Sequence, residues 1–154
     1  MRWEALVRIL SDQLEALKTL LRLHEKEKVA LCKLDAAMLE EAVVEKNASI
    51  QRFNELENRR LEVLHEAGLE GKPLKELAEK APAGTKEALL ALRNELKKTA
   101  EKLSEAQKLN CGLILNARFQ IEMLMNLLSP HSGRTYGQHG RLEQSGASTF
   151  NRRI

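Results

Sequence analysis

The chain has 154 residues, of which 43% are hydrophobic, 31% are charged and only 3% are aromatic. This length fits a single domain, and a composition with so few aromatic residues predicts an all-α protein. The same composition excludes a β-sandwich and an aromatic-lined sugar-binding cleft. No apolar run in the sequence approaches the length of about 18 residues that a membrane-spanning helix needs, so we expect none.

The positive charge is concentrated at one end of the chain. Residues 1–128 hold 21 basic and 21 acidic residues, although the net charge of the whole chain is +3. The remaining residues hold Arg134, Arg141, Arg152 and Arg153 against the single acid Glu143. Four separated arginines do not form the basic stripe that phosphate binding requires, so we expect no nucleic-acid partner. Cys32 and Cys111 are the only cysteines, and the sequence opens on a charged helix without the pattern of a signal peptide, so we expect a reduced, cytoplasmic protein. No second cluster of Cys or His accompanies them, so we expect neither a disulfide nor a metal site.

The first predicted helix covers residues 2–31. Its apolar residues recur at steps of three and four, which places one broad face towards a core. That face consists of Trp3, Val7, Leu10, Leu14, Leu17, Leu21, His24 and Leu31. We expect a turn from Cys32 to Asp35, because Asp35 can cap a new helix and an unbroken helix to Gly68 would be about 100 Å long.

The second predicted helix covers residues 36–67, and its apolar face is the weakest. Lys46 and Glu57 interrupt the face, which consists of Leu39, Val43, Ile50, Phe53, Leu56, Leu61 and Leu64. Gly68 is expected to end this helix. A short helix over residues 73–80 then lies between glycine and proline signals.

The third long helix is predicted over residues 85–128, with Thr85 as its N-cap. Its seam, read at alternating steps of four and three, consists of Leu92, Leu96, Thr99, Leu103, Ala106, Asn110, Leu113, Ala117, Gln120, Leu124 and Leu127. Short connections imply antiparallel neighbours, so we predict an antiparallel bundle of three long helices with a short connecting helix. Residues 1–128 would form this bundle, and residues 129–154 a flexible C-terminal tail too polar and glycine-rich for a core.

One pair of residues could suggest metal chemistry. Glu62 and His65 form an E-x-x-H pair, which di-iron helical bundles use twice to bind two metal ions. The chain has no second copy, so a surface histidine near a helix end is the better interpretation. No catalytic triad or glycine-rich phosphate loop occurs, and we expect neither an enzyme nor a cofactor.

The amides on the long helix allow two interpretations. Asn110 and Gln120 lie on its seam and Asn116 lies beside it. Buried amides could fix the register of packed helices. Alternatively, this half of the helix is left uncovered and offers a groove to a partner helix, with Gly112 leaving space and Met123 and Met125 adding adaptable contacts.

Three segments together carry a resemblance to a known family. The second helix contains Glu45-Lys46, Ile50, Leu56, Arg60-Leu61, Leu64 and Gly68, the long helix contains Leu109-Asn110-Cys111-Gly112-Leu113, and the tail reads Thr135-Tyr136-Gly137-Gln138-His139-Gly140. In this order they resemble the FlgN-type chaperones of flagellar type III export. The Tyr-Gly-x-x-Gly pattern after a long terminal helix is the most specific part.

The resemblance implies a cytoplasmic export chaperone. Such proteins bind the C-terminal helical segments of the hook-associated proteins that join hook and filament, prevent their premature assembly and deliver them to the membrane export gate. The client-binding residues would be Asn110, Leu113, Asn116, Ala117, Gln120, Leu124 and Leu127. Tyr136, Gly137 and Gly140 would dock the tail at the gate, with Phe150 as a second anchor and the export ATPase complex as a further partner.

Two other classes of protein remain open at this stage. The seam could belong to a coiled-coil scaffold, or to a chaperone of another secretion system with a different client. A half-covered seam could also pair with itself in the absence of a client.

Overall fold

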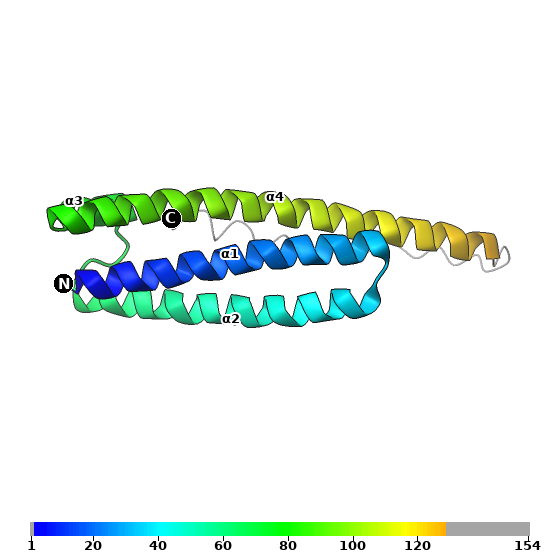
Figure 1. Ribbon diagram of the computed structural model, residues 1–154, viewed down its shortest axis with the longest axis horizontal. Coiled ribbons are helices and arrows are strands. Elements are labelled where there is room, and N and C mark those ends of the chain that lie inside the picture. Colours follow the sequence, from blue (N-terminus) through cyan, green and yellow to red (C-terminus); the bar gives the residue numbers. More distant parts are fainter. Residues whose placement is uncertain (1, 129–154) are drawn as a thin grey trace.

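The computed structural model describes residues 2–128, which fold into four helices without a strand (Figure 1). They are α1 (Trp3–Lys33), α2 (Ala36–Glu66), α3 (Leu74–Lys80) and α4 (Ala83–Leu128). The predictions of an all-α class and of three long helices with a short connecting helix are confirmed. The predicted antiparallel arrangement of all neighbours is not confirmed, because α1 and α4 pack against each other in the same direction (Figure 1). The predicted tail lies outside the described residues.

The turn between α1 and α2 forms where the sequence predicted it. Leu34 adopts a left-handed backbone with φ of 56°, which ends α1. The Asp35 N–H donates to the Ala30 carbonyl at 3.0 Å, and the Asp35 carboxylate accepts from the Met38 N–H at 3.0 Å. Asp35 is therefore the N-cap of α2, as expected.

The α2 helix ends just before the predicted glycine. Gly68 has a φ of 64°, and the Leu69 N–H bonds to the Leu64 carbonyl at 2.9 Å. This left-handed closure is the usual way in which a glycine ends a helix. A second positive φ, at Gly71, redirects the chain towards α3.

The start of α4 differs from the prediction. The helix begins at Ala83, two residues before the predicted start, and the Lys86 N–H donates to the Pro82 carbonyl at 2.8 Å. Thr85 lies inside the first turn and is not the N-cap. Proline suits the start of a helix because its missing N–H would have no partner inside the helix there.

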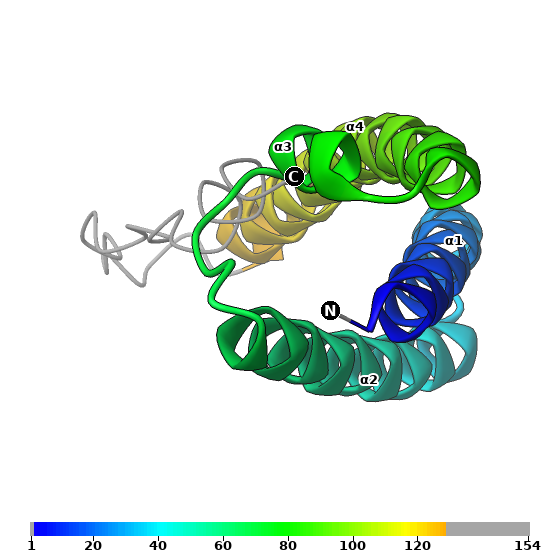
Figure 2. The same ribbon diagram turned by 90° about the vertical axis from the view of Figure 1, so that its left-hand side faces the viewer.

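The three long helices form an open trough and not a closed bundle. α1 packs against α2 on one side and α4 on the other, whereas the backbones of α2 and α4 do not come close to each other. Figure 2 shows this arrangement end-on, with α1 joining the other two and the opposite side open. α2 runs antiparallel to α1 and α4 (Figure 1). The backbone of α3 lies close only to that of α4, and the leucines of α3 join α1 in the core.

The core is built almost entirely by leucines of α1, α3 and α4. Leu6, Leu17, Leu77 and Leu89 are fully buried. The surrounding cluster adds Leu10, Leu14, Leu20, Leu64, Leu74, Ala78 and Leu96. Leu64 is the one member from α2, which agrees with the weak apolar face predicted for that helix.

Polar contacts supplement the attachment of α2 to α1. The Lys46 ammonium donates to Glu27 at 2.7 Å, and the side chain of Glu27 is only 6% exposed. Gln13 donates to Glu57 at 2.9 Å, and the same carboxylate receives two hydrogen bonds from Arg60. Lys46 and Glu57, which interrupt the apolar face of α2, therefore both have a hydrogen-bond partner on α1.

Replacing Leu89 by Ala is expected to lower the free energy of unfolding by about 2–5 kcal/mol, because the substitution leaves a cavity in the core. Urea denaturation followed by circular dichroism measures this loss. Leu115→Ala is the matched control, and it should change the stability by less than about 0.5 kcal/mol because Leu115 is exposed. Equal losses in the two variants would contradict the assignment of the core.

Candidate binding groove

A groove of about 530 Å³ occupies the open side of the trough. α1 forms its floor, and α2 and α4 form its walls. The lining residues are Leu17, Leu20, His24 and Glu27 from α1, Lys46, Ile50, Phe53 and Asn54 from α2, and Ala100, Leu103, Ser104, Gln107, Asn110, Cys111 and Ile114 from α4. The groove exists because α2 and α4 are held apart by the width of α1.

The chemistry of the groove changes along its length. One stretch is apolar, with Leu20 on the floor and Phe53 and Leu103 on the two walls. The next stretch, towards the α1–α2 turn, contains the Glu27–Lys46 ion pair. The last stretch is apolar again, because Ile114 lines it at the point where α4 extends beyond the other helices.

Asn110 links α4 to the floor of the groove. Its side-chain amide nitrogen donates to the His24 carbonyl at 2.9 Å and lies 3.4 Å from His24 Nδ1. Asn110 is only 3% exposed. Of the two interpretations of the seam amides, the structure supports the fixing of helix register for Asn110. Asn116 and Gln120 are exposed and make no such link.

His24 is held in its neutral form by its surroundings. Burial lowers its pKa below the ordinary histidine value, and the neighbouring Lys46 ammonium lowers it further. Glu27 raises the pKa but does not cancel these two effects. A neutral ring also suits the contact with Asn110, because the Nδ1 atom facing an amide N–H must be an acceptor.

Beyond the groove, α4 continues alone. In Figure 1 its yellow-to-orange end extends past the α1–α2 turn. We call residues 113–128 the α4 extension. Its exposed large apolar residues are Ile114, Leu115, Phe119, Ile121, Met123, Leu124, Met125, Leu127 and Leu128. Its only charged residues, Arg118 and Glu122, pair with each other at 3.2 Å.

Such a surface is unusual for an isolated helix. A helix that is apolar on most sides is normally covered by other structure, and a contiguous exposed apolar patch usually marks an interaction site. No helix in the described part of the chain is both long and apolar enough to cross a membrane. Its exposed apolar residues make the α4 extension a candidate interaction surface.

The structure distributes the predicted client-binding residues over different environments. Asn110 is buried, and Leu113 and Ala117 are half-buried. Asn116, Gln120, Leu124 and Leu127 are exposed on the α4 extension. The predicted docking residues Tyr136, Gly137 and Gly140 lie outside the described residues.

The apolar face predicted for α2 was expected in the core, yet two of its residues line the groove. Ile50 is exposed and Phe53 is half-buried, and both line the groove. The signal that could have identified this wall is Lys46. An apolar face that a charged residue interrupts is too sparse to be covered along its whole length.

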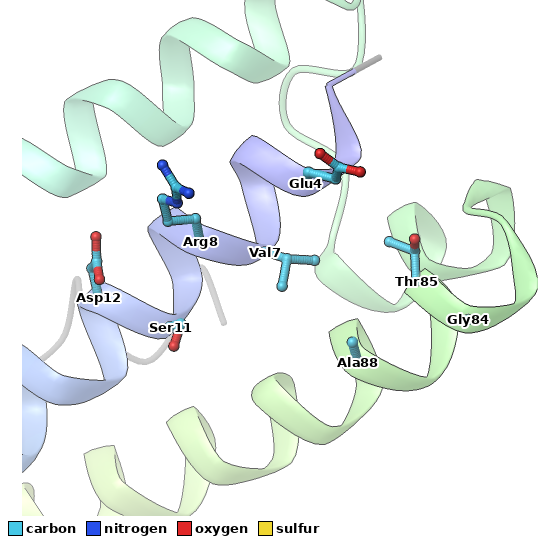
Figure 3. A pocket seen from close by; sticks show the side chains of 8 residues that line it. All are labelled: Glu4, Val7, Arg8, Ser11, Asp12, Gly84, Thr85 and Ala88. Atoms are coloured by element: carbon cyan, nitrogen blue, oxygen red, sulfur yellow. The ribbon is translucent and has the colours of Figure 1, made fainter.

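A second, shallower recess lies between the first turns of α1 and α4, with a volume of about 430 Å³. Figure 3 shows the side chains of Arg8 and Asp12 extending away from α4, so charged groups do not converge in the recess. His65, from the E-x-x-H pair, is exposed and contacts Glu70. Within residues 2–128 no group of three or more His, Cys, Asp or Glu could hold a metal ion.

Comparison with known proteins gives one match. The family model described as FlgN protein matches residues 1–144. The chain belongs to the FlgN family. This confirms the resemblance found in the sequence, and FlgN proteins are flagellar export chaperones. Neither the curated proteins nor the solved structures contain a match to this chain.

The neutral state of His24 predicts a pH dependence of stability in this FlgN protein. Because the pKa of His24 is lower in the folded than in the unfolded chain, its stabilising contribution is present above about pH 6.5 and is lost as the pH falls through the folded pKa. Urea midpoints at pH 7.5 and pH 5.5 should therefore differ more in the wild type than in His24→Gln. Asn47→Gln, at an exposed residue that does not titrate, should behave like the wild type.

Proposed function

We propose that this FlgN protein binds, in the cytoplasm, the C-terminal helical segments of the hook-associated proteins that join hook and filament. In this proposal it prevents their premature assembly and delivers them to the type III export gate. The observation that carries the proposal is the open apolar trough that continues into the α4 extension. Membership of the FlgN family supports it.

A client helix fits the open side on physical grounds. A helix with its side chains is about 10 Å across, similar to the width of α1 that separates the two groove walls. Lying in the groove, the client helix would contact Phe53 on α2 and Leu103 on α4 and would close the trough into a four-helix bundle. Apolar residues at three- and four-residue spacing would supply the anchors on the client.

The α4 extension would continue the binding surface. Ile114 joins the groove to the extension, and Leu124 and Leu127 lie further along it with more than half of their surface exposed. Asn116 and Gln120 would provide polar contacts at the edge. Asn110 contributes indirectly, because its bond to His24 holds α4 in register above the groove floor.

The combined substitution Ile114→Asp and Leu124→Asp is expected to weaken client binding at least tenfold, because two carboxylates would be desolvated on the apolar surface. Calorimetric titration with a peptide covering the C-terminal helix of a hook-associated protein measures the affinity, and apolar burial should give a negative heat-capacity change. Leu34→Asp, at an exposed residue in the α1–α2 turn, is the control and should bind normally. Unchanged affinity in the double variant would place the client elsewhere.

The tail has a separate role in the proposal. Tyr136, with Gly137 and Gly140 beside it, would dock the loaded chaperone at the export gate, and the export ATPase complex would be a further contact. The FlgN resemblance supports this assignment.

Tyr136→Ala is expected to leave the affinity for the client peptide unchanged and to weaken binding to the cytoplasmic domain of the export gate. Pull-down with immobilised gate domain measures the second effect. Gate binding equal to that of the wild type would refute the assigned role of Tyr136. Loss of client binding in the same variant would instead assign the tail to the client site.

A further inference from the structure

Lys46 is the charged residue of the α2 wall of the groove. Its ammonium donates to the Glu27 carboxylate at 2.7 Å, and both residues line the groove. The side chain of Glu27 is 6% exposed and that of Lys46 is 22% exposed, so solvent still reaches the lysine. A helix bound in the groove would cover Lys46 and remove that solvent.

Covering Lys46 would leave part of its hydrogen-bonding capacity without an acceptor. An ammonium carries three N–H donors, and within residues 2–128 the Lys46 ammonium bonds one oxygen of Glu27. The apolar residues of the same wall have no side-chain acceptor. On the opposite wall, the Asn110 amide nitrogen is itself a donor, to the His24 carbonyl. Because a buried donor without an acceptor is costly, a tightly bound helix must supply the acceptor.

The balance of charge at this point of the groove favours a neutral acceptor. Glu27 and Lys46 cancel each other, and His24 is uncharged because burial and the Lys46 ammonium lower its pKa. A carboxylate on the bound helix would add an uncompensated negative charge beside Glu27, and a second ammonium would meet Lys46. The carbonyl oxygen of an asparagine or glutamine side chain accepts from Lys46 without adding charge.

The ion pair also defines where this amide lies on the bound helix. Leu20 and Phe53 belong to the apolar stretch of the groove. Phe53 lies seven residues from Lys46 on α2, and Leu20 lies seven residues from Glu27 on α1. Seven residues are two helical turns, or about 10 Å. A helix lying along the groove has the same rise, so its amide would lie seven residues from the apolar side chain that contacts Phe53.

We propose that the groove selects helices that carry an asparagine or glutamine facing Lys46, seven residues from an apolar side chain over Phe53. A single buried amide fixes the register of coiled coils in a similar way, because other registers leave polar groups unmatched. Helices that are apolar along the whole contact face would bind more weakly, and this difference provides specificity. The inference rests on the proposed binding of a client helix in the groove.

Calorimetric titration of the full chain with designed helical peptides tests the inference. Each peptide consists of three heptads with leucine at the a and d positions, and the peptides differ only at the central a position, which is Gln, Leu, Glu or Lys. The Gln peptide is expected to bind most tightly, about tenfold more tightly than the Leu peptide, because only the amide offers Lys46 a neutral acceptor.

A paired substitution in the protein tests whether the ion pair causes the preference. Glu27→Met combined with Lys46→Met removes both charges, so neither is left buried and unpaired. In this variant the preference should reverse, with the Leu peptide bound more tightly than the Gln peptide. Lys26→Met combined with Glu45→Met is the matched control, because it removes an ion pair between α1 and α2 outside the groove lining. This control should keep the wild-type preference.

The possible outcomes separate this inference from the proposed function. Equal affinities of the Gln and Leu peptides for the wild type would overturn the inference and leave the groove as a helix-binding site. A preference for Gln that persists without Glu27 and Lys46 would overturn it as well. If none of the four peptides bound, both the inference and the binding of a helix in the groove would be refuted.

Discussion

Leucine packing along α1 is the interaction on which the rest of the structure depends. α1 is the one helix of the described chain that contacts both α2 and α4. Its leucines from Leu6 to Leu20 join α3 and α4 in a single core. Because the backbones of α2 and α4 stay apart, the groove is a consequence of this packing and needs no special loop or insertion.

Polar pairing decides how each wall of the groove is attached. α4 is fixed to α1 by leucines and by the Asn110–His24 link, so its register is defined by both shape and hydrogen bonding. α2 buries only Ala42, Leu56, Arg60 and Leu64, and Glu27–Lys46 supplies the best-buried ion pair of its contact with α1. A buried ion pair contributes little net stability, because desolvation offsets the attraction. The α4 wall is therefore attached to α1 more firmly than the α2 wall.

The sequence predicted the helices well because their signals are local. The spacing of leucines, the cap at Asp35 and the glycine closure at Gly68 all act within a few residues. The one wrong cap, Thr85, also has a local reason, because the Pro82 carbonyl accepts the first hydrogen bond of α4 and the helix begins before Thr85.

The candidate site was harder to predict. A seam looks the same whichever helix covers it, so the seam alone could not show that Asn110 faces His24 while Gln120 faces solvent. The partner of Lys46, 19 residues away on another helix, is equally invisible to periodicity.

The unequal attachment of α2 and α4 has a consequence for the order in which the molecule opens. Regions with few buried apolar contacts open locally at a lower free energy than the core, and hydrogen exchange reports such opening. α2 is the helix with the fewest leucines in the core, so we expect its amide hydrogens to exchange at a lower free energy of opening than those of α1, α3 and α4. Opening at α2 would also expose Leu56 and Leu64, so the α2 wall of the groove is bound less firmly than the α4 wall but is still part of the apolar core.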